Sequence, residues 1–328
     1  EREDKGMTTA TEKRRLGRTE IEITPLGLGG NKFSGGKGLT GLVFPEIPQP
    51  EVDAIVRAAF DGGCNWVDTA EMYGGGRSEQ ALAHALWAAG MQDDQVVVAT
   101  KWSPLMRTAN HIRRSIDDRL GFLGGYTIDL YMVHQPWGFS SPEAEMEAMT
   151  DLVEAGKIRS VGVSNFSEER MRRAHAALER RGQPLAANQM HYSLLHREIE
   201  TNGVLDAAKE LGITIIAYQP LASGLLTGKY QREPERLRQA GFARRMMLGR
   251  DLERSKPVVE VLEEVAARHD ATPAQVALNW LVTFQGESVV AIPGASKVRH
   301  AAENAGACEL RLSEEELARA DEVSRAGR

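Results

Sequence analysis

Four residues in the first half of the chain carry side chains that could together move a proton: Asp68, Tyr73, Lys101 and His134. Asp68, Lys101 and His134 each end a short apolar segment, and Tyr73 follows Asp68 by five residues. A lysine ammonium beside a phenol stabilises the phenolate and lowers the pKa of the phenol from about 10 toward neutral. A carboxylate can hold that lysine, and a histidine can orient a carbonyl oxygen within hydrogen-bond reach of the phenol. Such a set would donate a proton to a carbonyl oxygen.

Each of the four residues also has an ordinary structural interpretation. An aspartate at a strand end commonly caps a turn, and a lysine there commonly lies in solvent. His134 could satisfy a hydrogen bond, and Tyr73 could anchor a loop. Four such residues at the ends of neighbouring strands favour the chemical interpretation, because parallel strands bring their carboxyl ends to one rim. No side chain supplies hydride, so carbonyl reduction would require a redox cofactor.

The rest of the sequence predicts the elements that would position this set. Short apolar segments alternate with amphipathic helical segments, and several of the apolar segments are nearly continuous, as in a parallel sheet covered by helices. The predicted strands are 25–30, 65–70, 95–101, 128–134, 158–165, 185–192, 214–221 and 288–295. Eight such units predict an α/β fold, the (β/α)8 TIM barrel. A doubly wound sheet would carry G-x-G-x-x-G after its first strand, and here Lys32 occupies the sixth position.

Segments outside the eight units are predicted as additions to the barrel. Residues 13–23 should form a β-hairpin that closes the amino-terminal end of the barrel. Capping boxes at Thr272 and Ser313 should begin two late helices, the second being an extra helix at the carboxyl terminus. Residues 31–49 and 222–256, the latter with seven arginines, are predicted as long loops.

Composition excludes several classes of function. The net charge of −6 gives no reason to expect nucleic acid or a membrane surface as a partner, and the chain has no apolar run long enough to span a membrane. Cys64 and Cys308 are too few for a disulfide framework and lack metal-ligand spacing, so we expect no metal and a cytoplasmic protein. We expect one domain over 13–328, preceded by a lead over 1–12 that is flexible or foreign to the natural protein. Oligomerisation is possible and does not follow from the sequence.

The stretch DTAEMYGGGRSE (68–79) places three glycines directly after Tyr73. Their spacing has no phosphate-binding signature. We predict that they let the chain turn back before Ser78 caps the next helix, which leaves room above the tyrosine for cofactor and substrate.

Seven motifs, taken in order, resemble the aldo-keto reductase superfamily over residues 13–325. They are DTAEMYG, ATKW, LYMVHQP, AGKIRSVGVSNF, NQMHYSLL, AYQPLASGLLTGKY and IPGASKVRHAAEN. The IPGAS segment is similar to the bacterial branch near the potassium-channel β-subunit-like members. The resemblance implies a TIM-barrel reductase that uses NADPH on a small carbonyl substrate. It makes Tyr73 the general acid, tuned by Lys101 and Asp68, and lets His134 orient the carbonyl.

The same resemblance implies contacts to the nicotinamide half of the cofactor. Ser164, Asn165 and Gln189 would hold the carboxamide, because an amide needs both donors and acceptors. Tyr218 would stack on the nicotinamide face. Further contacts of this half, including the pyrophosphate segment, are implied for Gly30, Asn31, Gln219, Pro220, Leu221, Ser223, Gly224 and Lys229.

The adenosine half of the cofactor is implied to lie at the start of the helix of the last βα unit. Ser296, with Lys297 or Arg299, would bind a 2′-phosphate, which favours NADPH over NADH. The alternative is that Lys297 and Arg299 are ordinary solvated charges. The remaining residues implied for this half are Gly294, His300, Glu303 and Asn304.

Substrate selection is the least determined part of the sequence. Gly30 and Asn31 stand where many relatives have Thr-Trp, and we predict Trp102 and Trp137 as an apolar pocket wall, with ordinary rim packing as the alternative. An NADPH-binding redox-sensing subunit is a second possible function. A Schiff-base aldolase with Lys101 as nucleophile is a third.

Overall fold

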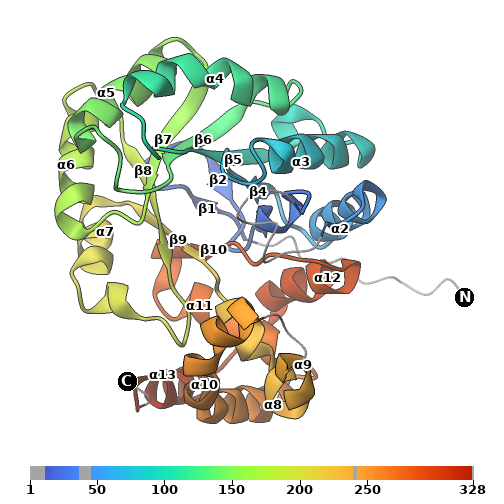
Figure 1. Ribbon diagram of the computed structural model, residues 1–328. Coiled ribbons are helices and arrows are strands. Elements are labelled where there is room, and N and C mark those ends of the chain that lie inside the picture. Colours follow the sequence, from blue (N-terminus) through green and yellow to red (C-terminus); the bar gives the residue numbers. More distant parts are fainter. Residues whose placement is uncertain (1–11, 37–45, 239–241, 327–328) are drawn as a thin grey trace, which may run out of the picture.

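The computed structural model describes residues 12–36, 46–238 and 242–326, and its centre is one curled sheet of eight parallel strands (Figure 1). Neighbouring strands in the sheet are consecutive in the chain. They are β3 (Leu28–Gly29), β4 (Trp66–Asp68), β5 (Val97–Trp102), β6 (Ile128–Val133), β7 (Ile158–Ser164), β8 (Leu185–His191), β9 (Thr214–Tyr218) and β10 (Val289–Ala291). The two edges meet where Gly27 N donates to Ala291 O and Ala291 N donates to Pro25 O, both at 2.9 Å. These bonds close the sheet and confirm the predicted (β/α)8 barrel.

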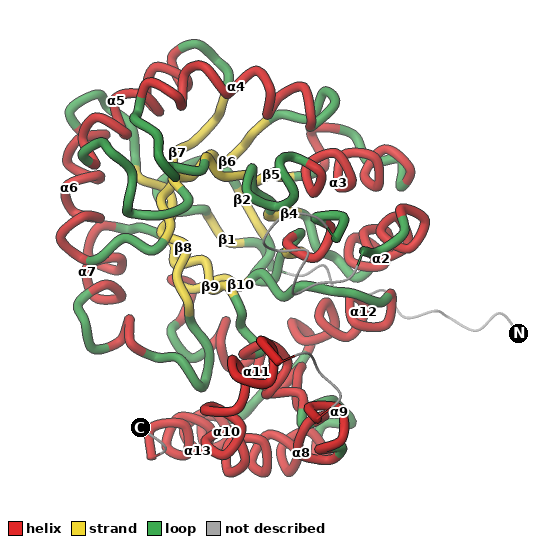
Figure 2. The backbone as a smooth tube through the Cα atoms, in the orientation of Figure 1, coloured by secondary structure: helices red, strands yellow, loops and turns green. Residues whose placement is uncertain are grey.

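Helices surround this sheet on its outer side (Figure 2). They are α2 (Gln49–Asp61), α3 (Arg77–Ala88), α4 (Asn110–Phe122), α5 (Pro142–Glu154), α6 (Glu168–Glu179), α7 (Val204–Leu211), α11 (Pro273–Thr283) and α12 (Val298–Gly306). Apolar side chains fill the layer between the sheet and these helices, and a separate apolar cluster fills the barrel interior. Within the described parts of the chain, no helix is both long and apolar enough to cross a membrane.

The amino-terminal hairpin consists of β1 (Arg14–Arg15) and β2 (Glu22–Ile23), which pair antiparallel. Its turn contacts the barrel where Gly17 N donates to Thr214 Oγ1 at 2.7 Å. Leu16 is buried in the interior cluster. Since Thr214 begins β9, the hairpin closes the amino-terminal end of the barrel, as predicted.

The segment 222–256 is mostly helical, so its prediction as a long loop is wrong. It contains η4 (Ala222–Thr227), α8 (Lys229–Arg232), α9 (Pro234–Arg238) and the first half of α10 (Phe242–Arg268). Helix α10 packs on α11 and α13 beside the barrel (Figure 1). The sequence did not predict it because Pro257 lies inside the helix, where proline ordinarily ends helices.

The segment 31–49 contains η1 (Asn31–Phe33), and α2 begins at its last residue. Residues 37–45 lie outside the described part of the chain, and so does the predicted lead apart from Glu12. The remaining short helices are η2 (Asp93–Gln95), η3 (Glu198–Glu200), η5 (Gly286–Ser288) and η6 (Ala307–Glu309).

Both predicted capping boxes are present. Thr272 and Gln275 exchange side-chain and backbone hydrogen bonds at the start of α11. Ser313 and Glu316 do the same at the start of α13 (Glu314–Ala326), the predicted extra helix. The carboxyl terminus therefore folds as a helix on the barrel.

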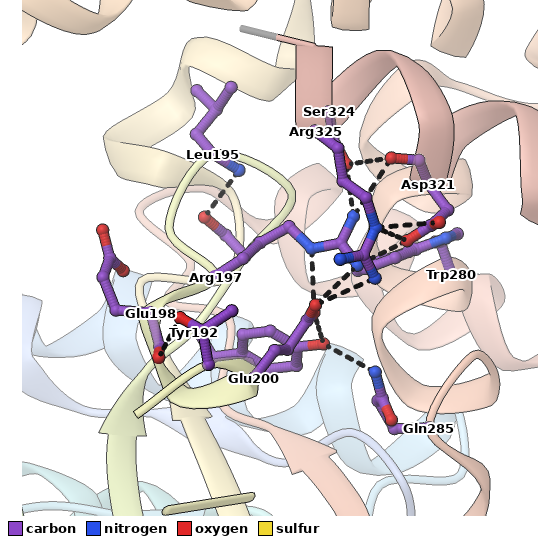
Figure 3. A network of polar contacts seen from close by, with 12 residues as sticks. Tyr192, Leu195, Arg197, Glu198, Glu200, Trp280, Gln285, Asp321, Ser324 and Arg325 are labelled. Carbon is purple, nitrogen blue, oxygen red and sulfur yellow. Dashed lines mark hydrogen bonds and ion pairs between the residues drawn. The ribbon is translucent and has the colours of Figure 1, made fainter. Parts of the chain in front are cut away.

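Helix α13 is fastened by a buried arginine (Figure 3). The Arg197 guanidinium pairs with Glu200 at 2.8 Å and with Asp321 at 2.5 Å, and it donates to Ser324 Oγ. It also lies 4.9 Å from the centre of the Trp280 ring. We call these five residues the arginine latch, because they tie α13 to η3 and α11.

Candidate active site

A buried ion pair lies at the carboxyl ends of β4 and β5. Lys101 Nζ is 2.7 Å from Asp68 Oδ1 and donates to the Thr69 carbonyl at 2.8 Å. Gln189 Nε2 donates to the other oxygen of Asp68 at 2.8 Å. Burial raises the pKa of Asp68 and lowers the pKa of Lys101, and the attraction between the two charges opposes both shifts. The structure thus holds the lysine charge in a fixed place.

Tyr73 lies against this pair, on the turn that follows β4. Lys101 Nζ is 5.3 Å from the centre of the Tyr73 ring, and the His134 ring meets that ring edge-on at 5.7 Å between centroids. The four residues predicted for catalysis are therefore brought together.

The pKa of Tyr73 is raised rather than lowered, which corrects the predicted direction. Burial is the largest cause, and the negative charge of Asp68 adds to it. Lys101 does not outweigh these effects, because its ammonium already binds Asp68 and the Thr69 carbonyl. Tyr73 therefore keeps its proton at neutral pH, as a proton donor must.

The three glycines after Tyr73 make the predicted turn. All three have φ between +66° and +99°, the left-handed region. A Cβ on Gly74 would lie 2.3 Å from the Ser34 carbonyl oxygen, and one on Gly76 would lie 2.4 Å from the Phe122 ring. The turn therefore needs glycine for both backbone conformation and close packing.

Ser78 does not cap α3, so that prediction is wrong. The helix begins at Arg77, and its N-cap is Gly76. Ser78 Oγ instead donates to the Gly30 carbonyl at 2.7 Å, which ties α3 to the corner after β3. Gly30 N in turn donates to the Asp68 carbonyl at 2.7 Å. Gly30 therefore supports the backbone of Asp68.

His134 follows β6 directly and extends its pairing with β5, since His134 N donates to the Trp102 carbonyl at 3.0 Å. Burial lowers the pKa of His134 to about 3, and the charge of Lys101 acts in the same direction. Its Nδ1 is buried and has no hydrogen-bond partner in the described structure. The imidazole is neutral at physiological pH and can donate one hydrogen bond.

The residues implied for the nicotinamide form one interlocked group beside the ion pair. Asn165, at φ +61°, donates through Nδ2 to Ser164 Oγ at 3.0 Å. Its Oδ1 accepts from the Tyr218 hydroxyl at 2.9 Å, and Ser164 Oγ donates to the Gln189 carbonyl at 3.0 Å. The side-chain amide nitrogen of Gln189 donates to Asp68, and this hydrogen bond was not predicted from the sequence.

The segment implied for the pyrophosphate has an unusual backbone. Gln219, Ser223 and Gly224 all have positive φ, at +52°, +55° and +91°. A Cβ on Gly224 would lie 2.6 Å from Lys229 Nζ. Glycine therefore leaves space beside a lysine ammonium, which fits a phosphate group. The neighbouring Pro220 is buried, and Leu221 is half-buried.

The residues implied for the adenosine half carry a concentration of positive charge. Burial is the largest cause of the lowered pKa of His300, on α12, and the charges of Arg299, Lys32, Lys229 and Lys297 lower it further. Cations from three separate segments thus act on His300 near the start of α12, and such a concentration of positive charge fits a phosphate.

Among the cations that act on His300, Lys32 was not predicted from the sequence. A Cβ on Gly294 would lie 3.7 Å from Lys32 Cε and 3.4 Å from Asn31 Oδ1, so the corner after β3 reaches the segment that follows β10. The available signal was a basic residue directly after Asn31, which was itself predicted. Lys297 also pairs with Glu51 at 2.8 Å, and Ser296 Oγ lies 3.4 Å from His300 Nδ1.

Two other residues predicted on α12 lie further along the helix. Asn304 is buried and lines a small hollow with Ala59 and Cys64, on the side of α12 that packs against α2. Glu303 is half-buried. Across the described residues, no group of three or more histidine, cysteine, aspartate or glutamate side chains is placed to hold a metal ion.

Trp102 does not line a pocket, so that prediction is wrong. It is fully buried between the sheet and α4, where its Nε1 donates to His111 Nδ1 at 3.1 Å. Alternation along β5 explains this, since Lys101 points into the barrel and the next residue must point out.

Trp137, by contrast, is half exposed on the loop that follows His134. Phe139 on the same loop and Leu105 and Met106 on the β5–α4 loop are also exposed. The two loops are joined where Phe139 N donates to the Arg107 carbonyl at 3.0 Å. These four apolar side chains, which we call the apolar rim, lie on loops at the carboxyl ends of the strands.

Glu71 was also missed and connects the tyrosine turn to the apolar rim. Its carboxylate accepts from Arg107 at 2.6 Å and from Ser103 N at 2.9 Å. Both donors belong to the β5–α4 loop. An acidic residue two positions before Tyr73 was the available signal.

The chain matches the family model described as "Aldo/keto reductase family" over residues 25–325. It is 32% identical to "Probable aldo-keto reductase 1" of Glycine max, covering 91% of this chain and 88% of that protein. It is 34% identical to "Aldo-keto reductase yakc [NADP(+)]" of Schizosaccharomyces pombe, covering 80% and 78%. The crystal structure of the thermostable aldo-keto reductase Tm1743 with the inhibitor epalrestat matches with a TM-score of 0.76 and 30% identity, over 95% of this chain and 99% of that one.

Proposed function

Because this chain belongs to the aldo/keto reductase family, we propose that it reduces an aldehyde or ketone to an alcohol with NADPH, and that Tyr73 is the general acid. The observation that carries the proposal is the arrangement at the strand ends. A buried Lys101–Asp68 pair lies beneath Tyr73, and a neutral His134 meets the same ring. Each of these four residues has a separate role in the transfer of a proton to a carbonyl oxygen.

The cofactor, when bound, supplies the hydride to the carbonyl carbon. Tyr73 holds its proton until the carbonyl oxygen becomes basic, and then donates it. The Lys101 ammonium stabilises the phenolate that remains, and Asp68 keeps the ammonium in position. His134 donates a hydrogen bond to the developing negative charge on the oxygen. A proton from solvent then restores the phenol.

A preference for NADPH over NADH is the finer part of the proposal. The cations around the start of α12 would pair with a 2′-phosphate, which NADH lacks. Ser296 and Lys297 precede that helix and would contribute, and Ser164, Asn165 and Tyr218 would hold the opposite end of the cofactor. The printed name of the Schizosaccharomyces pombe relative, which includes NADP(+), supports the same choice.

The apolar rim supports a carbonyl substrate with an apolar body. Trp137 and Phe139 are 50% and 64% exposed, three and five residues after His134, and such exposure of large apolar groups marks contact surfaces. We place the reaction in the cytoplasm, where the free thiols of Cys64 and Cys308 would stay reduced.

The decisive test is Tyr73→Phe. We expect NADPH to bind as before and kcat/KM for carbonyl reduction to fall about 10²- to 10⁴-fold, because general acid catalysis is lost. Tyr131→Phe is the matched control, since the Tyr131 hydroxyl is buried without a hydrogen-bond partner in the described structure and Tyr131 lies on β6, two strands away from β4. Near-normal activity of Tyr73→Phe would show that Tyr73 is not the acid.

The cofactor preference can be measured separately. We expect NADPH to quench tryptophan fluorescence at concentrations at least about tenfold lower than NADH, since a charge-assisted phosphate contact is worth about 1.5 kcal/mol or more. Equal titration curves would remove the argument for a 2′-phosphate site.

Two other functions remain as outcomes of these tests. Tight NADPH binding without turnover across aldehydes, ketosugars and quinones would favour a redox-sensing subunit. The buried ion pair argues against a Schiff-base aldolase, because a nucleophilic lysine must be unprotonated and Lys101 is held as an ammonium between Asp68 and the Thr69 carbonyl. Borohydride trapping of a substrate on Lys101 would reverse that conclusion.

A further inference from the structure

Three aromatic rings form a column behind the cofactor side of the site. The Tyr218 and His191 rings are stacked at 5.1 Å with an angle of 6° between their planes. His196 stacks on His191 at 4.0 Å and 28°. Tyr218 and His191 are direct partners in the pairing of β9 with β8, so the backbone itself sets the first contact.

Both ends of this column are anchored. The Tyr218 hydroxyl donates to Asn165 Oδ1 at 2.9 Å. At the other end, His196 Nε2 lies 3.4 Å from Asp251 Oδ2, and Arg254 on the same helix, α10, pairs with Asp251 at 2.9 Å. The column therefore runs from the strand ends of the barrel to α10.

The middle ring is neutral under ordinary conditions. Burial lowers the pKa of His191 to about 4, the neighbouring His196 lowers it further, and the carboxylates of Glu198 and Asp251 oppose the shift. A neutral imidazole stacks on a phenol without bringing an unpaired charge into the interior.

We propose that His191 and His196 are positioning residues for the nicotinamide ring, which they fix through Tyr218. This rests on the proposed function, since the family resemblance places the nicotinamide against Tyr218. His191 covers one face of the Tyr218 ring, and the ring as a whole is only half-buried. A ring that is already held in place loses less conformational freedom when a ligand stacks on it, so the column strengthens cofactor binding.

The test compares His191→Leu with His191→Phe in the full chain. NADPH dissociation constants are measured by tryptophan fluorescence and by calorimetry, and kcat is measured at saturating NADPH. We expect His191→Leu to weaken NADPH binding about three- to tenfold, the range of an aromatic pair, and to change kcat by less than about twofold. His191→Phe keeps a flat ring and should restore the affinity. His84→Leu, an exposed histidine on α3, is the control and should change nothing.

A double-mutant cycle separates positioning from general loss of structure. In a Tyr218→Ala background, His191→Leu should weaken NADPH binding no further, because its effect passes through the Tyr218 ring. An equal loss in both backgrounds, or a His191→Phe variant as weak as His191→Leu, would overturn the proposal. If His191→Leu does not fold, as judged by thermal unfolding without cofactor, the same comparison is made with His196→Leu and His196→Phe. Failure of the unmodified protein to bind NADPH would overturn the proposed function itself.

Discussion

Lys101 and Arg197 are basic side chains with no exposed surface among the described residues, and their surroundings differ. Both Lys101 and Arg197 have side chains that are 0% exposed and pair with carboxylates. Every group around Arg197 is engaged: Glu200 accepts from Arg197, Tyr192 and Arg325, and Asp321 accepts from two arginines (Figure 3). In the described structure, no side-chain atom of the arginine latch is buried without a partner.

Lys101 lies instead beside polar groups that could still bind or protonate a ligand. His134 Nδ1 is buried without a partner, and Tyr73 keeps a proton that it can give away. Burying a charge is costly in either place, so burial alone does not distinguish catalysis from fastening. The difference is a buried polar atom without a hydrogen-bond partner, His134 Nδ1. Its presence marks the strand ends as a place for a ligand, and the absence of such an atom among the described contacts of the arginine latch marks that region as structural.

Removing the lysine charge should separate the two regions most sharply. We expect Lys101→Met to lower kcat/KM for carbonyl reduction by about 10²- to 10⁴-fold, because the phenolate of Tyr73 loses the nearby ammonium and Asp68 loses its ion-pair partner. The measurement is NADPH oxidation at saturating cofactor, with the dissociation constant of NADPH determined in parallel. A variant that stays within about tenfold of normal activity would make Lys101 structural, like Arg197.

The reciprocal change is Arg197→Met. Breaking the arginine latch leaves Glu200 and Asp321 without their main cation, so we expect the free energy of unfolding to fall by about 3–5 kcal/mol. Urea titration followed by circular dichroism measures this, and kcat per folded molecule should stay near normal. Arg325→Met is the control, because that side chain is 47% exposed and should cost only about 0–1 kcal/mol. Loss of kcat without loss of stability would contradict the division between the two regions.

The sequence predicted the barrel and the grouping of the four candidate residues at its rim because both depend on local rules. Strand ends are visible in the sequence, and parallel strands must bring their ends to one rim, so Asp68, Lys101 and His134 followed from register. The direction of the Tyr73 pKa did not follow, since it depends on how far Lys101 is already occupied by Asp68 and Thr69. Spacing cannot show such competition.

The features that the sequence analysis missed depend on contacts between distant segments. Helix α10 follows a charged stretch and contains Pro257, whose low helix propensity disfavours a continuous helix. Packing on α11 and α13 stabilises the helix nevertheless. The orientation of Trp102 needed only the alternation of β5, and it could have been predicted from Lys101. Lys32 reaches Gly294 only because the barrel closes.

Acid should weaken the candidate active site before the arginine latch, and between pH 7 and pH 5 this is the smallest of the expected effects. Burial lowers the pKa of His134 to about 3 and that of His191 to about 4, so both stay neutral in the folded protein while the unfolded chain takes up protons below about pH 6.5. Each histidine therefore removes about 1.4 kcal/mol of stability per pH unit between pH 6.5 and its folded pKa.

The arginine latch responds in a different window. Burial raises the pKa of Asp321, but the hydrogen bonds from Arg325 and Arg197 outweigh it, so the pKa is lowered overall. Its contribution is present above about pH 3.8 and is lost only below that value. Urea unfolding at pH 7, 6 and 5 should show a shallower pH slope for His134→Gln than for the unmodified protein, and an unchanged slope for Asp321→Asn. Equal slopes for the unmodified protein and His134→Gln would show that burying a neutral His134 is not what makes the candidate active site sensitive to acid.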